Sequence, residues 1–217
     1  MSYVLVNMTN SFQGGANDDV FFKIKSLWDY GLATTKHAIE TENVKNFIEN
    51  DLTAFDLVIS EEFKQESFLM FAHKYNCPLI TIGTLDYADY MDQAKGALQP
   101  WSHVPHFLSY YDDKMNFFQR LQNTIISLYD VIGRKFYYMP KQNQMAKTAF
   151  RALENQNGLL PTIEQMEKKI AVFLVNSHPV LTYVRPKMPG MIDIAGLHVR
   201  PAKQLPKIIE VSTKSLT

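Results

Sequence analysis

Two adjacent glutamates, Glu61 and Glu62, follow a short run of residues rich in β-branched side chains, 55–60. Such a run is typical of a buried parallel strand. Glu61 would then stand at the carboxyl end of a strand, the edge where open α/β sheets bind their ligands. A carboxylate there can accept a proton or orient a histidine. The two acids would equally complement the N-terminus of a following helix, so both roles remain open.

A second candidate region is the loop at 84–112, which is rich in aromatic residues and histidine. Long ordered loops over a sheet edge often form binding walls, and aromatic density suits an apolar pocket with a few polar groups. The loop can equally be packed against the core. Our candidate ligand-binding residues are Tyr87, Trp101, His103, Phe107 and Tyr110.

Several familiar chemistries lack their sequence patterns. No G-x-G-x-x-G follows a predicted strand, and no G-x-x-x-x-G-K-[ST] phosphate loop is present. The six histidines form no H-E-x-x-H pattern, and the single cysteine, Cys77, cannot build a thiolate zinc site. No G-x-S-x-G nucleophile elbow occurs. We therefore expect neither a metal nor a bound cofactor.

Composition describes a globular chain without an obvious nucleic-acid or membrane partner. The 217 residues are 46% hydrophobic and 20% charged, and 22 Lys plus Arg balance 22 Asp plus Glu. This balance lacks the basic footprint of a nucleic-acid-binding protein. The longest apolar runs are far shorter than the roughly 20 residues of a membrane helix, and the first residues lack the basic region of a signal peptide.

The elements that position the candidate residues alternate between strands and helices. Short apolar runs predict strands at 55–60, 78–83, 171–176 and 191–195. Helical periodicity predicts helices at 18–31, 42–50, 113–138 and 142–154, another that runs up to Asn76, and a short one from Pro161. In the longest, apolar residues recur at spacings of three and four on one face. A strand, a helix and a strand within 55–83 predict a parallel βαβ unit, and the class is α/β with a mostly parallel sheet.

Several blocks of sequence, in the same order, resemble the N-terminal half of animal UDP-glycosyltransferases, a family that includes UDP-glucuronosyltransferases, and especially its arthropod branch. The blocks are 55–61 (FDLVISE), 71–80 (FAHKYNCPLI), 100–105 (PWSHVP) and 113–123 (DKMNFFQRLQN). The most specific stretch is 175–179 (VNSHP), continuing through Arg185-Pro186 to 192–198 (IDIAGLH). The resemblance covers about residues 40–208.

This resemblance implies a GT-B type enzyme with two facing Rossmann-like domains. The N-terminal domain would bind a small lipophilic acceptor, and the C-terminal domain would bind most of the UDP-sugar donor. The sugar would be transferred with inversion and without a metal or cofactor. A histidine would act as general base and a carboxylate would orient it. Glu61 matches the position of that carboxylate, although many relatives have Asp there, and the loop aromatics would contact the acceptor.

The resemblance also implies an incomplete domain. Residues 1–207 would form a partial N-terminal acceptor-binding domain, and 208–217 a divergent tail where the interdomain linker would begin. The first strand-helix unit with its histidine, and the donor domain, have no counterpart in this sequence. We therefore expect the chain alone to be inactive, and poorly soluble because of an exposed sheet edge. The longer polypeptide would sit in the endoplasmic reticulum membrane on its lumenal face, and a homo-oligomer is possible.

Two other functions remain open. The chain can be a non-catalytic module that binds small molecules in an aromatic cleft. It can also be a nucleotide-dependent oxidoreductase on a similar sheet, although the missing glycine fingerprint argues against that function.

Overall fold

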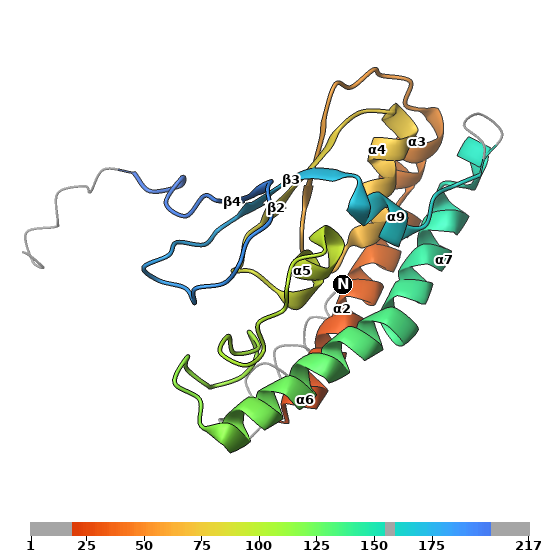
Figure 1. Ribbon diagram of the computed structural model, residues 1–217. Coiled ribbons are helices and arrows are strands. Elements are labelled where there is room, and N and C mark those ends of the chain that lie inside the picture. The colour runs from red at the N-terminus through yellow and green to blue at the C-terminus, as the bar shows by residue number, and fades with distance from the viewer. Residues whose placement is uncertain (1–18, 155–158, 201–217) are drawn as a thin grey trace, which may run out of the picture.

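A four-stranded parallel sheet forms the centre of the molecule, for which a computed structural model describes residues 19–154 and 159–200. The strands are β1 (Val58–Glu61), β2 (Leu79–Gly83), β3 (Ile170–Val175) and β4 (Met191–Asp193). They are ordered β1-β2-β3-β4, and all three neighbouring pairs are parallel (Figure 1). The four predicted strands and the α/β class are therefore confirmed.

Helices precede the sheet and form its crossovers. α2 (Val20–Glu40) and α3 (Glu42–Asn50) precede β1, and the 3-10 helix η1 (Glu66–Leu69) continues into α4 (Met70–Tyr75) between β1 and β2. The long crossover from β2 to β3 contains α5 (Asp89–Lys95), α6 (Phe117–Gly133), the π-helical turn η2 (Arg134–Tyr138), α7 (Met139–Ala149), the 3-10 turn η3 (Arg151–Leu153) and α9 (Ile163–Lys168). α5 was not predicted and lies inside the predicted loop.

α2 runs nine residues further than predicted. Its start is as expected, because Asp19 caps it by accepting a hydrogen bond from the N–H of Phe21. Gly31 is not its end, however. A Cβ at Gly31 would lie 2.5 Å from the Cβ of Lys64, so this glycine permits close packing of α2 against the chain after β1. The prediction took Gly31 as the end of the helix, whereas this glycine lies inside the helix and allows close packing.

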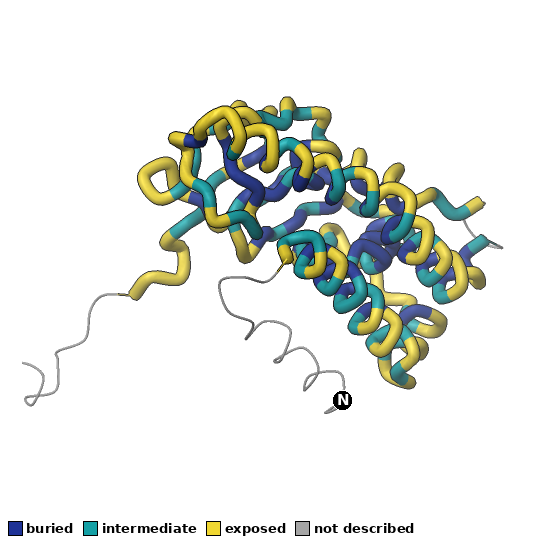
Figure 2. Tube along the Cα trace, turned by 90° about the horizontal axis from the view of Figure 1, so that it is seen from below, coloured by how far each residue is buried: buried dark blue, intermediate teal, exposed yellow. Residues whose placement is uncertain are grey.

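The core lies between the sheet and the helices that cover it, and Figure 2 shows the buried segments gathered inside the outer helices. β2 alternates buried and half-buried residues, as expected for a strand inside a sheet. β1 differs from its prediction as a buried strand. Ile59 at its centre is 58% exposed, because β1 is the edge strand of the described sheet.

α6 carries its apolar stripe on the outside. The six residues of this row are between 45% and 77% exposed, and they are Phe118, Leu121, Ile125, Leu128, Ile132 and Phe136. The face toward the protein is largely polar and includes buried Asn123, Ser127 and Asp130. An apolar stripe ordinarily faces the core, so this helix reverses the usual arrangement.

In the described segments, no helix combines the length and apolar character needed to cross a bilayer. The tail predicted at 208–217 lies outside the described residues, and the domain boundary stays a prediction.

Candidate functional site

Glu61 is the last residue of β1 and is exposed at the carboxyl edge of the sheet. Its Oε1 accepts a hydrogen bond from the hydroxyl of Thr84, at 3.0 Å. Thr84 directly follows β2, which pairs with β1 in register, Glu61 opposite Ile82. The parallel pairing therefore brings a carboxylate and a hydroxyl from two strand ends together. The position of Glu61 at a strand end was predicted, whereas no role was predicted for Thr84.

The end of β3 joins the same edge through Asn176. Its side-chain amide donates to the carbonyl of Thr84 at 3.1 Å, and its backbone N–H donates to Gly83 O at 2.9 Å. His178, also exposed, follows two residues later. We call Glu61, Thr84 and Asn176 the Glu61 edge. Each is a polar residue at or just after the end of a strand. The same sequence position could therefore have identified Thr84 and Asn176 as well as Glu61.

Glu62 points to the opposite side, into the protein. Burial raises the pKa of its carboxyl to about 8, and the charge of Glu66 adds to the effect. Arg134 pairs with Glu66 at 3.1 Å and also with Glu167, within the same buried charge cluster. Helical structure begins only at Glu66. The two glutamates therefore do not act together at a helix N-terminus, and only Glu61 faces the sheet edge.

Tyr87 is buried beside the end of β4. Its hydroxyl donates to Asp193 Oδ1 at 3.0 Å, and burial and this hydrogen bond raise the pKa of the phenol. Lys187 forms an ion pair with Asp193, and its Nζ lies 5.1 Å from the centre of the Tyr87 ring. Tyr87 thus connects the aromatic loop to the carboxyl edge of the sheet.

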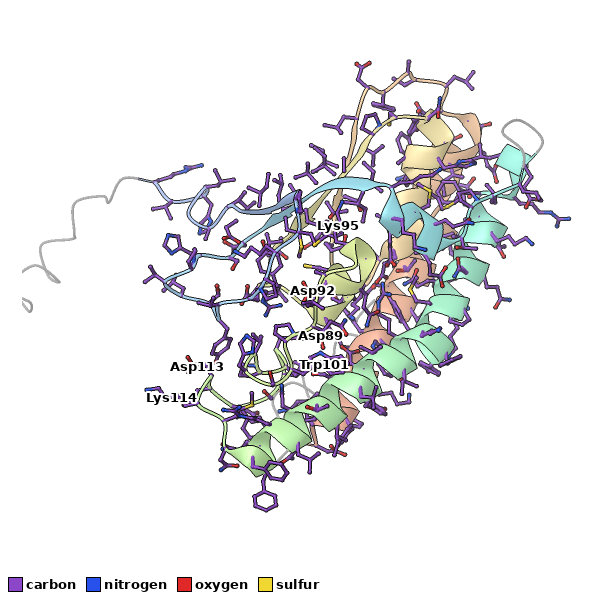
Figure 3. All side chains as sticks on the ribbon, in the orientation of Figure 1. Asp89, Asp92, Lys95, Trp101, Asp113 and Lys114 are labelled. Atoms are coloured by element: carbon purple, nitrogen blue, oxygen red, sulfur yellow. The ribbon has the colours of Figure 1, made fainter. Side chains whose placement is uncertain are left out.

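The other four predicted ligand-binding residues have separate surroundings. The indole N–H of Trp101 donates to Asp89 at 2.9 Å, and Figure 3 shows the two side chains together where α5 begins. His103 and Phe107 are exposed on the loop. Tyr110 is 73% exposed and accepts a hydrogen bond from Lys23 of α2. Within the described residues, no hydrogen bond or ring contact joins any of the five residues to another, so their joint role stays a prediction.

A buried histidine anchors the aromatic loop to α6. His106 Nε2 lies 3.2 Å from Asp130 Oδ2, and Trp28 of α2 donates to Asp130 Oδ1 at 3.0 Å. Asn123 accepts from the backbone N–H of His106 and donates to the carbonyls of Trp101 and Val104. Burial alone would raise the pKa of Asp130, but the bond to His106 and the charge of Lys64 hold it below its ordinary value. These contacts explain why the inner face of α6 is polar.

The segment after His178 is held to α5 by a buried ion pair. Arg185 Nη1 lies 3.5 Å from Asp92 Oδ2, and its guanidinium lies 5.4 Å from the centre of the Tyr87 ring. Burial raises the pKa of Asp92 to about 6. The pair fixes the loop between β3 and β4 over the start of the aromatic loop.

The described residues contain no group of three or more His, Cys, Asp or Glu side chains arranged to hold a metal ion. A cavity of about 460 Å³ lies elsewhere, between α2, α3 and α7, and none of the six predicted site residues lines it.

Comparisons with known proteins point to one enzyme family. The chain is 28% identical to UDP-glycosyltransferase UGT5 of Dactylopius coccus, over 88% of this chain and 37% of that protein. It is 32% identical to UDP-glucosyltransferase 2 of the same insect, over 72% of this chain and 29% of the relative. UDP-glucuronosyltransferase 3A1 of Bos taurus is 26% identical over 94% of this chain and 36% of its own length. The chain thus spans about a third of the length of these relatives.

No solved structure matches the chain. A sequence model of the family described as "UDP-glucoronosyl and UDP-glucosyl transferase" matches residues 3–216, nearly the whole chain. The resemblance found in the sequence blocks is confirmed, and the chain belongs to this family of UDP-sugar-dependent transferases.

Proposed function

We propose that the chain forms the acceptor-binding part of an enzyme that transfers a sugar from a UDP-sugar to a small lipophilic acceptor, with inversion at the anomeric carbon. Family membership supports the reaction class. The position of Glu61 carries the assignment to this chain, because a carboxylate at the carboxyl edge of a parallel sheet stands where ligands bind in open α/β folds.

In this proposal Glu61 orients a histidine that acts as general base. Thr84 occupies Oε1, which fixes the carboxylate and leaves Oε2 to accept an imidazole N–H. The histidine removes the proton from the acceptor hydroxyl, whose oxygen attacks the anomeric carbon as UDP leaves. No histidine within residues 19–154 and 159–200 bonds to Glu61. We therefore assign the base to a part of the polypeptide outside the described residues.

The aromatic loop would supply the acceptor side of the site. Tyr87 connects this loop to the sheet edge through Asp193, and Trp101 is held against α5 through Asp89. The exposed side chains of His103, Phe107 and Tyr110 would contact an apolar acceptor. UDP-sugar is the donor substrate, and the proposal requires no further cofactor. It also places the longer polypeptide at the lumenal face of the endoplasmic reticulum membrane, as the family resemblance implies.

The products of the reaction test this function. The full-length polypeptide that contains this chain is incubated with UDP-glucose or UDP-glucuronic acid and a set of phenols. We expect UDP release and a β-linked glycoside, identified by mass and by the coupling constant of its anomeric proton in NMR spectra. Trp101→Ala should raise the KM for the phenol several-fold with little effect on the KM for the donor, because Trp101 lies in the proposed acceptor loop.

Two results would contradict this proposal. An α-linked product would exclude inversion. Saturable binding of the phenols without sugar transfer would instead support the non-catalytic binding module.

A further inference from the structure

The outward position of Glu61 is linked to the inward position of its neighbour Glu62, because successive residues of a strand face opposite sides. The backbone N–H of Glu62 donates to Ile82 O at 2.9 Å and so extends the pairing of β1 with β2 by one residue beyond Glu61. The chain then leaves the sheet, and Lys64 adopts a left-handed conformation with a φ of 58°. A slip of one residue at this point would exchange the places of the two carboxylates.

The phenol of Tyr90 on α5 holds Glu62 in the inward position. Its hydroxyl donates to the backbone carbonyl of Glu62 at 2.9 Å. Both residues are buried, and a buried carbonyl that lost its partner would destabilise this conformation of the chain. The hydrogen bond therefore favours the arrangement in which Glu62 stays inside the protein and Glu61 stays at the sheet edge.

Two basic side chains lie against the ring of Tyr90. The Nζ atom of Lys64 is 4.4 Å from the ring centre, and the guanidinium of Arg134 is 5.4 Å from it. Both contacts involve the aromatic ring and do not require its hydroxyl. Tyr90→Phe would therefore keep the ring in place and remove only the hydrogen bond to Glu62.

The helix that carries Tyr90 is anchored on both sides of this residue. Asp89 accepts the indole N–H of Trp101 at 2.9 Å, and Asp92 forms the buried ion pair with Arg185 of the loop between β3 and β4. Figure 3 shows both aspartates on α5. α5 is thus tied to the aromatic loop and to the β3–β4 loop, and these contacts fix the point from which the Tyr90 hydroxyl reaches the end of β1.

We propose that Tyr90 is a positioning residue for sugar transfer: its hydroxyl fixes the backbone just after Glu61 and thereby the direction in which the Glu61 carboxylate points. This inference rests on the proposed role of Glu61 as the carboxylate that orients the base. Because Tyr90 is buried, it acts through Glu61 and not on a substrate. A carboxylate that is held in one direction can keep an imidazole in the geometry and tautomer that proton removal requires.

A double-mutant cycle on the full-length polypeptide, with a UDP-sugar donor and a phenol acceptor, tests this role. Tyr90→Phe should lower kcat at least about tenfold, with little change in the KM for the donor. In Glu61→Gln, where the carboxylate to be positioned is gone, the same substitution should lower kcat less than about twofold. Tyr137→Phe is the matched control, because it removes a hydroxyl that donates to Asp29 on α2 at 2.6 Å, and it should keep the kcat of either background.

The pH profile of kcat/KM gives a second readout, which a loss of stability alone would not move. A carboxylate beside an imidazole raises the pKa of the imidazole, so a misdirected Glu61 should shift the acid limb of the Tyr90→Phe profile to lower pH. An unchanged acid limb, a wild-type kcat in Tyr90→Phe, or an equal loss of kcat with and without the Glu61 carboxylate would overturn the positioning role and leave the proposed function standing. A wild-type kcat in Glu61→Gln would instead overturn the proposed role of Glu61, and this inference with it.

Discussion

At the scale of single residues, Glu61 and Glu62 show how one strand separates two neighbouring carboxylates. Successive side chains of a strand point to opposite faces, so Glu61 reaches the hydroxyl of Thr84 at the sheet edge and Glu62 enters the buried charge cluster. Lys64 and Glu66 belong to the same cluster, and burial lowers the pKa of the Lys64 ammonium. Of the two, only Glu61 is exposed at the sheet edge, where it accepts the hydrogen bond from Thr84.

The raised pKa of Glu62 predicts a pH dependence of stability. The folded protein holds this proton up to a pH of about 8, whereas the unfolded chain releases it near the ordinary value of 4.5. The folded state therefore binds more protons between these values, and the contribution of Glu62 to the unfolding free energy declines as the pH rises from about 5 to 8. Glu62→Gln, which cannot ionise, should gain about 1–3 kcal/mol relative to wild type between pH 5.5 and 8.5.

Urea unfolding at the two pH values measures this difference. Glu49→Gln, a substitution of an exposed carboxylate on α3, should follow wild type at both pH values. Equal changes in wild type and Glu62→Gln would show that Glu62 ionises normally in the folded protein.

At the scale of elements, the strands were predictable because short β-branched runs bounded by polar residues have few alternatives to a buried strand. Their burial was not, because the exposure of Ile59 depends on β1 being an edge strand. The apolar stripe of α6 was also predicted correctly from the spacing of its residues. Its outward direction depends on Asn123 and Asp130, which bond to distant residues that periodicity cannot identify.

In the candidate site too, one part could be predicted from the sequence and another part could not. The position of Glu61 follows from a strand end, which a local pattern reveals. The surroundings of the aromatic residues depend on long-range partners, such as Asp193 for Tyr87 and Lys23 for Tyr110. Loop composition alone therefore could not place these residues relative to one another.

The contact between α2 and α6 predicts a strong effect of a small substitution. A Cβ at Gly133 would overlap the ring of Trp28, whose indole N–H bonds to Asp130. Gly133→Ala should therefore lower the unfolding free energy by about 1–3 kcal/mol, although alanine is the better helix former. Urea unfolding checks this value.

A double-mutant cycle isolates the cause. In a Trp28→Leu background, Gly133→Ala should become neutral or slightly stabilising, because the ring that it would meet is gone. The same cost in both backgrounds would mean that the glycine is needed for a reason other than the Trp28 contact.

At the scale of the whole molecule, the candidate site lies at one edge of the sheet, and the apolar stripe of α6 is exposed on the helices. The Glu61 edge lies at the carboxyl ends of β1, β2 and β3, whereas α6 runs along the outer side of the molecule, away from the sheet (Figure 1). Ile125 is 51% exposed, and the contacts of α6 with the aromatic loop are made by Asn123 and Asp130, so its side chain can be changed without touching the Glu61 edge. We therefore expect Ile125→Glu to retain sugar transfer, which a comparison of its initial rate with wild type measures.

The most direct test of the central claim is the turnover number of Glu61→Gln in the full-length polypeptide, with a UDP-sugar donor and a phenol acceptor. Without an orienting carboxylate the histidine loses its correct position and tautomer, so kcat should fall by about 10²–10⁴-fold while the KM for the donor changes little. Glu49→Gln should keep the wild-type kcat. A wild-type kcat in Glu61→Gln would contradict the account, because the sheet edge described here would then have no part in the reaction.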